Sequence, residues 1–208
     1  MNSPRRVTPP TALALYARSR AIPTALAAFA CAALLTLWVA GRPDAFLDPY
    51  RRVPLLSLAP LLASAAIGLS LHSYARDLDE TAVRPWWPRR LAHLLVLTAL
   101  AATVLALAVP GQAQVFGSAG MVRNTLGAVG ITAAGAVLFG ARASWMPTML
   151  YFSAVYLSAS PRMSGETILT WPMQTGPQTG AWAAALALYV LGSALYAVRG
   201  ARPQGPRG

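Results

Sequence analysis

The sequence predicts an all-α, polytopic membrane protein with six transmembrane helices and both termini in the cytoplasm. Three observations lead to this fold class. Only 11% of the 208 residues are charged, whereas a soluble domain has about a quarter of its residues charged. Hydrophobic residues make up 56% of the chain. Six charge-free runs also approach the length of about 20 residues that a hydrocarbon core about 30 Å thick requires.

The six runs are separated by short polar stretches. They extend from Ala21 to Ala40, Pro54 to Ser73, Leu91 to Val109, Asn124 to Ala141, Ala143 to Ser160 and Thr179 to Val198. Only Arg142 divides the fourth run from the fifth, and one helix of that combined length would overshoot the bilayer. Gly140, Arg142 and Ser144 predict a tight turn, with Pro147 in the first turn of the next helix. Five spans are the alternative, because the fourth run is short and rich in glycine.

The arginine distribution predicts the orientation. All 17 cations are arginine, and a cytoplasmic N-terminus places twelve of them inside and five outside. We therefore assign residues 1–20 to a cytoplasmic N-terminal segment, 21–198 to a transmembrane domain and 199–208 to a cytoplasmic tail in the cell membrane. Residues 11–20 form either an interfacial helix on the inner leaflet or an extension of the first span.

Several classes of function are excluded by missing residue types. A P-loop ATPase and a lysine Schiff base both need lysine, and the chain has none. The arginines are scattered between apolar runs, which argues against nucleic acid. None of the six acids lies within a predicted span, which disfavours ion coupling. Cys31 can form no internal disulfide and is interpreted as a small buried hydrophobe.

The few candidate catalytic groups also fail. His72 and His93 have no nearby carboxylate and make a poor metal site. The stretch Gly117-Ser118-Ala119-Gly120 has no histidine after it with which its serine could form a dyad. We therefore predict no enzyme, no metal and no cofactor.

The loop between the second and third spans is the most polar part of the chain. Asp77 and Glu80 have the spacing of a helix-capping pair, and Leu78 and Ala82 share one face. The predicted partner-binding residues of this short cytoplasmic helix are Arg76, Asp77, Leu78, Asp79, Glu80 and Ala82. A solvated connector is the alternative. Trp86 and Trp87 beside two arginines are typical of an interfacial anchor.

Arg123 and Asn124 lie at the outer end of the fourth predicted span. An arginine at the bilayer centre costs about 2.5–3.5 kcal/mol on insertion scales, so we expect Arg123 to snorkel to the surface; lining a pathway is the alternative. The outer loop from Pro161 to Gly180 is expected to dip as an irregular or half-helical hairpin; an exposed loop is the alternative. Small residues at intervals of four, Thr132, Ala136, Gly140 and Ser64, Gly68, favour internal helix packing over a dimer seam.

This layout resembles the membrane subunit of an ABC-2-type transporter. The stretches Arg76-Asp77-Leu78-Asp79-Glu80-Thr81 and Arg123-Asn124-Thr125-Leu126-Gly127 are similar to those of small actinobacterial integral membrane proteins labelled as permeases. The resemblance implies an exporter with a homo- or heterodimer of membrane subunits and a separate P-loop ATPase subunit. In that case the 77–83 helix would receive the ATP-driven motion. The alternative is a non-transporting membrane scaffold or immunity protein that binds a partner within the bilayer.

Overall fold

All regular structure in the described part of the chain is helical. The computed structural model describes residues 21–40, 49–72, 86–109, 117–158, 169–174 and 178–203. Its α-helices are α2 (Ile22–Ala40), α3 (Pro49–Ser70), α5 (Trp87–Leu107), α6 (Gly117–Phe139), α7 (Trp145–Ser158) and α8 (Thr179–Arg199). Two 3-10 helices, η2 (Ala141–Ala143) and η3 (Trp171–Met173), precede α7 and α8. Each predicted span overlaps one of the α-helices, and the all-α prediction is confirmed for the described residues.

Four of these helices are long and apolar enough to cross a membrane, namely α2, α5, α6 and α8. The apolar part of α3 is the shorter stretch Leu56–Ser70. Helix α7 has 14 residues, which corresponds to about 21 Å and is less than the thickness of a typical hydrocarbon core. The architecture is that of a helical membrane protein with four helices of spanning length and two shorter apolar ones.

The predicted start of the fourth span is wrong, but the turn between the fourth and fifth spans is confirmed. Helix α6 begins at Gly117 rather than Asn124, so it has 23 residues and is not short. It ends at Phe139, and the next residue, Gly140, has a φ of 87°; this left-handed conformation favours glycine. Residues Ala141–Ala143 then form η2, and α7 starts at Trp145 with Pro147 in its first turn.

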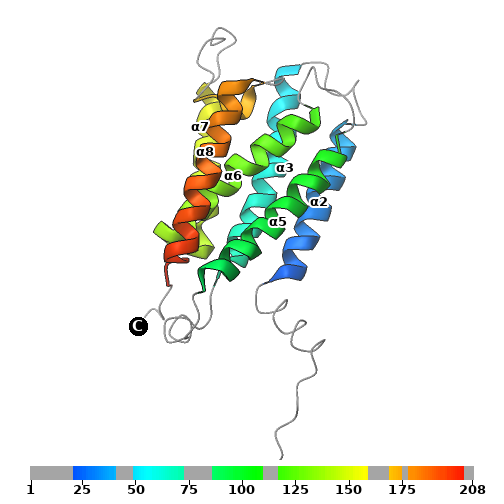
Figure 1. Ribbon diagram of the computed structural model, residues 1–208. Helices are drawn as coiled ribbons and strands as arrows, with labels where there is room; N and C mark the ends of the chain where they lie inside the picture. Colours follow the sequence, from blue (N-terminus) through cyan, green and yellow to red (C-terminus); the bar gives the residue numbers. More distant parts are fainter. Residues whose placement is uncertain are drawn as a thin grey trace, which may run out of the picture.

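Helix α6 is the centre of the bundle. It packs against α3, α5, α7 and α8, whereas α2 lies at one side against α3 and α5 (Figure 1). Peripheral α2 leaves Cys31 exposed, so the expectation that this cysteine is buried is wrong. A helix at the edge of a bundle in lipid can turn apolar side chains outward without contact with water.

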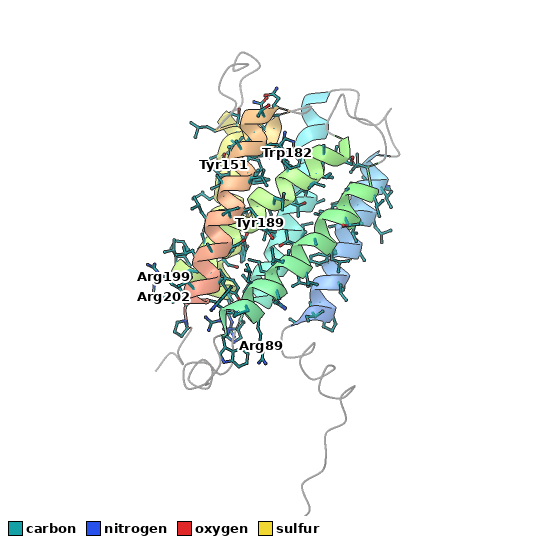
Figure 2. The ribbon with its side chains drawn as sticks, in the orientation of Figure 1. Arg89, Tyr151, Trp182, Tyr189, Arg199 and Arg202 are labelled. Carbon is teal, nitrogen blue, oxygen red and sulfur yellow. The ribbon has the colours of Figure 1, made fainter. Side chains whose placement is uncertain are left out.

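The chain enters α2 and leaves α8 at the same end of the bundle (Figure 1). Figure 2 places Arg89, Arg199 and Arg202 at this end, with Tyr151 and Trp182 toward the other. Arg202 donates from its backbone N–H to the carbonyl of Ala136 at 2.9 Å, which holds the chain after α8 beside the last turns of α6. We call this end, with Arg89, Arg90, Arg142, Arg199 and Arg202, the basic end.

The closest helix contact joins α6 and α8 through two glycines. A Cβ added at Gly192 would lie within about 3 Å of the backbone of Gly130, and one added at Gly130 would lie equally close to the backbone of Leu188 and Tyr189. In lipid, helix association depends on close packing because there is no hydrophobic force between apolar helices. Gly130 and Gly192 therefore let the α6 and α8 backbones approach each other.

Candidate functional site

A buried arginine in the central helix is the main polar feature of the bundle. Arg123 is the seventh residue of α6, about 9 Å along the helix axis from its first residue, and its exposed fraction is 0%. The prediction that it lies at the end of the span and snorkels to the surface is wrong. Because α6 begins at Gly117, Arg123 lies inside the helix on a face covered by other elements.

Carbonyl groups, rather than a carboxylate, accept hydrogen bonds from Arg123. Its Nη2 donates to the backbone oxygen of Gln174 at 2.6 Å, and its Nε donates to Oδ1 of Asn124 at 3.2 Å. Its Nη1 is buried and has no hydrogen-bond partner among the described residues. No described residue is acidic, so the described surroundings stabilise this cation through dipoles alone.

Asn124 holds the same segment at a second point. Its Nδ2 donates to the carbonyl of Pro172 at 2.7 Å, and Asn124 is fully buried. The Gln174 side chain donates to Oγ1 of Thr170 at 2.9 Å, which closes the segment on itself. Two consecutive residues of α6 therefore bind two carbonyls of the 169–174 segment.

Trp171 fills the space that Gly127 leaves on α6. A Cβ at Gly127 would collide with the Trp171 indole, which is 1% exposed. The ring packs edge to face with Phe152 at 5.8 Å and is stacked on Tyr151 at 6.2 Å. The Tyr151 hydroxyl donates to the carbonyl of Leu169 at 2.6 Å. This aromatic cluster links α6, α7 and the 169–174 segment.

A tyrosine and a threonine pair extend the polar interior toward α7. Tyr156 of α7 has a buried hydroxyl that makes no hydrogen bond among the described residues, and it is close enough to Arg123 of α6 to feel its charge. Further along α6, the hydroxyls of Thr132 and Thr148 lie 2.7 Å apart. These polar groups are buried between helices, where an unsatisfied group would be costly. The arrangement can hold the helices in register and can bind a carbonyl or anionic group at Arg123.

The other residues singled out from the sequence divide into described and undescribed positions. Arg76, Asp77, Leu78, Asp79, Glu80 and Ala82 lie outside the described residues, as does the 11–20 segment. His93 Nε2 lies 3.2 Å from Ser70 Oγ, and the described residues contain no cluster of three or more potential metal ligands. Thr132, Ala136 and Gly140 are buried, as are Ser64 and Gly68, which confirms internal packing for both faces.

Sequence reasoning identified Arg123 and Asn124 but missed Pro172 and Gln174, whose backbone carbonyls bind them. Backbone acceptors leave no signature in a sequence. Most of the loop that was expected to dip, including residues 161–168 and 175–177, lies outside the described residues; Trp171-Pro172 belongs to a 3-10 helix that contacts α6. The side-chain signal was therefore an aromatic residue in a polar loop.

Together the fold and this site define a helical membrane protein with a polar, hydrogen-bonded interior at its central helix. No family model, no curated protein and no solved structure matches the chain.

Proposed function

We propose that the chain is the membrane subunit of an exporter that is driven by a separate ATPase subunit, with two membrane subunits in the working unit. The observation that carries the proposal is that the chain ends of α2 and α8 share the basic end. Because the cytoplasmic side of membrane proteins carries the excess of arginine, this supports six crossings with both termini inside. An ATPase could then bind on the side where Asp77, Asp79 and Glu80 are expected.

One observation favours the alternative, a non-transporting membrane scaffold. Arg123 donates to Gln174 and Asn124 of its own chain, which is the pattern of a structural link rather than of an open pathway. The alternative requires no ATPase, so the two proposals differ in a partner that can be isolated. The scaffold has the same topology as the exporter, and the reporter fusions test that topology alone.

Reporter fusions after residues 48, 80, 115, 142, 170 and 205 should alternate in sidedness. A phosphatase that is active only outside the cytoplasm should work at residues 48, 115 and 170, and a fluorescent protein that folds only in the cytoplasm should work at 80, 142 and 205. Two successive fusions on the same side would remove a crossing and contradict the six-span topology.

Charge reversal of Asp77, Asp79 and Glu80 to arginine should lower the yield of co-purified P-loop ATPase by at least about tenfold, since like charges placed opposite each other at an interface cost several kcal/mol. The measurement is mass spectrometry of the complex in mild detergent. The matched control reverses Asp44 and Asp48, which lie in a predicted outer loop, and should retain the ATPase. If no ATPase co-purifies with the native chain, the scaffold is supported and the exporter is contradicted.

A further inference from the structure

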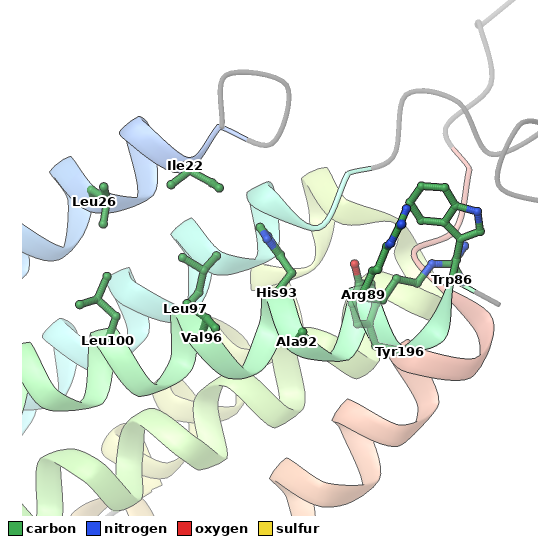
Figure 3. Close-up of a pocket in the computed structure, with 11 residues that line it drawn as sticks. Ile22, Leu26, Trp86, Arg89, Ala92, His93, Val96, Leu97, Leu100 and Tyr196 are labelled. Carbon is green, nitrogen blue, oxygen red and sulfur yellow. The ribbon is translucent and has the colours of Figure 1, made fainter. Parts of the chain in front are cut away.

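An open groove of about 740 Å³ lies between α2 and α5 at the basic end (Figure 3). Ile22 and Leu26 of α2 form one wall, and Val96 and Leu100 of α5 form the other. These four side chains are apolar and remain accessible from outside the bundle. A bilayer places lipid chains against such a surface, so the deep part of the groove suits a hydrocarbon chain.

The mouth of the groove is cationic and aromatic. Arg89 and Arg90 line it beside Trp86, and the Arg89 guanidinium lies 4.8 Å from the centre of the Trp86 ring. Among the described residues that line the groove, the charged side chains, Arg89 and Arg90, are both positive. Basic pockets between transmembrane helices at the cytoplasmic side are suited to anionic lipid headgroups.

The distance from the cationic mouth of the groove to its far apolar end matches the thickness of one leaflet. From Arg89 to Leu100 the helix rises about 16 Å, about half of a 30 Å hydrocarbon core. A ligand with its anionic group at Arg89 would therefore reach Leu100 with a single acyl chain near the bilayer midplane. A free phosphate would leave the apolar walls uncovered, and a neutral lipid would place no anionic charge beside the exposed Arg89 guanidinium.

We propose that this groove binds an anionic phospholipid, with its phosphate against Arg89 and Arg90 and one acyl chain between α2 and α5. The assignment to the cytoplasmic leaflet rests on the topology proposed above, whereas the lipid class does not. The groove does not include the buried Arg123, and its test uses the purified chain alone, so the result does not depend on any ATPase.

The experiment measures binding of phosphatidylglycerol to the purified full chain in detergent, by native mass spectrometry and by the rise in thermal unfolding temperature. The double variant R89Q/R90Q should bind about 30-fold more weakly, from the contribution of two arginines near an anionic headgroup. Phosphatidylcholine with the same acyl chains should give little stabilisation, and glycerol phosphate without acyl chains should give none.

Two matched controls distinguish lipid binding in the groove from general effects of surface charge and hydrophobicity. R142Q/R199Q removes the same charge from the basic end at exposed positions that do not line the groove, and it should bind as the native chain does. Ala92→Trp fills the groove from an exposed position and should abolish the lipid-dependent stabilisation. Ala194→Trp, at an exposed position on α8, should not.

Three results would overturn the proposal. Equal loss of binding in R142Q/R199Q would show a diffuse charge effect, and saturation by glycerol phosphate alone would show a phosphate site without a chain. The third result would come from a cross-linking experiment in a Cys31→Ser background that carries Ala12→Cys and Val96→Cys. A full-yield cross-link between them in saturating phosphatidylglycerol would show that the N-terminal segment of the chain occupies the groove.

Discussion

Replacing Gly192 with alanine should lower the free energy of unfolding, although alanine is the better helix former. Helix propensity alone favours the substitution by about 1 kcal/mol. The added Cβ would, however, meet the backbone of Gly130. The three atoms nearest to this Cβ are the O, C and Cα of Gly130. Backbone atoms within a packed helix cannot move aside as a flexible side chain can. Overpacking costs about 1–3 kcal/mol and occasionally more, so we expect the steric penalty to exceed the propensity gain.

The measurement is unfolding in detergent micelles, followed by circular dichroism. Gly130→Ala should have the same effect, because its Cβ meets the backbone of α8, and the double variant should be less destabilised than the sum of the two, because both changes force the same helices apart. Ala194→Leu on an exposed part of α8 should leave the unfolding temperature within about a degree of the native value, consistent with the small effect of surface changes. If Gly192→Ala stabilises the protein, the close α6–α8 contact is contradicted.

The positions of the helices could be predicted from the sequence because they overlap apolar runs, but the lengths of α7 and of the apolar part of α3 could not, since both are shorter than a bilayer-spanning helix. Apolar runs of about 20 residues report where a chain is in lipid, and Arg142 between two such runs correctly marked a turn. The start of α6 could not be read in this way. Gly117, Ser118 and Gly120 have little hydropathy, and they still belong to the helix, where Gly117 and Gly120 are buried and Ser118 is exposed.

The burial of Arg123 could not be predicted for a related reason. Insertion costs describe an arginine that faces lipid, whereas here the side chain faces protein and donates to two oxygens. Whether such acceptors exist depends on how the 169–174 segment folds over α6, which neither hydropathy nor spacing records. The same limit applied to Cys31, since the position of α2 at the edge of the bundle decides its exposure.

Replacing Arg123 with methionine should release the 169–174 segment from α6. Burying a charge without a carboxylate is expensive, and hydrophobic replacement of a buried ion can even stabilise a protein. Here the replacement also leaves the carbonyl of Gln174 without its donor at a partly buried position. A lost hydrogen bond to a charged group costs about 1.5–3 kcal/mol. We therefore expect a net destabilisation of about 2 kcal/mol, concentrated in the contacts of this segment.

Chemical labelling can separate local release of the 169–174 segment from global unfolding of the bundle. In a Cys31→Ser background, a cysteine at Met173 should react with a thiol reagent at least about tenfold faster in the Arg123→Met variant, as expected if about 1.4 kcal/mol or more of local stability is lost. Asn124→Leu should give a similar increase because it removes the bond to Pro172. Arg142→Met deletes the same charge at an exposed position and should leave the labelling rate unchanged.

The double variant Arg123→Met with Asn124→Leu decides whether the two side chains act as one unit. Both hold the 169–174 segment, so once either bond has released it, removal of the second should add little, and the two labelling effects should be clearly less than additive. Arg123→Lys should restore only part of the native rate, because an ammonium lacks the fixed fork by which Nη2 and Nε bind two acceptors at once. Fully additive effects, or complete rescue by lysine, would mean that Arg123 acts as a simple positive charge and not as a link between α6 and this segment.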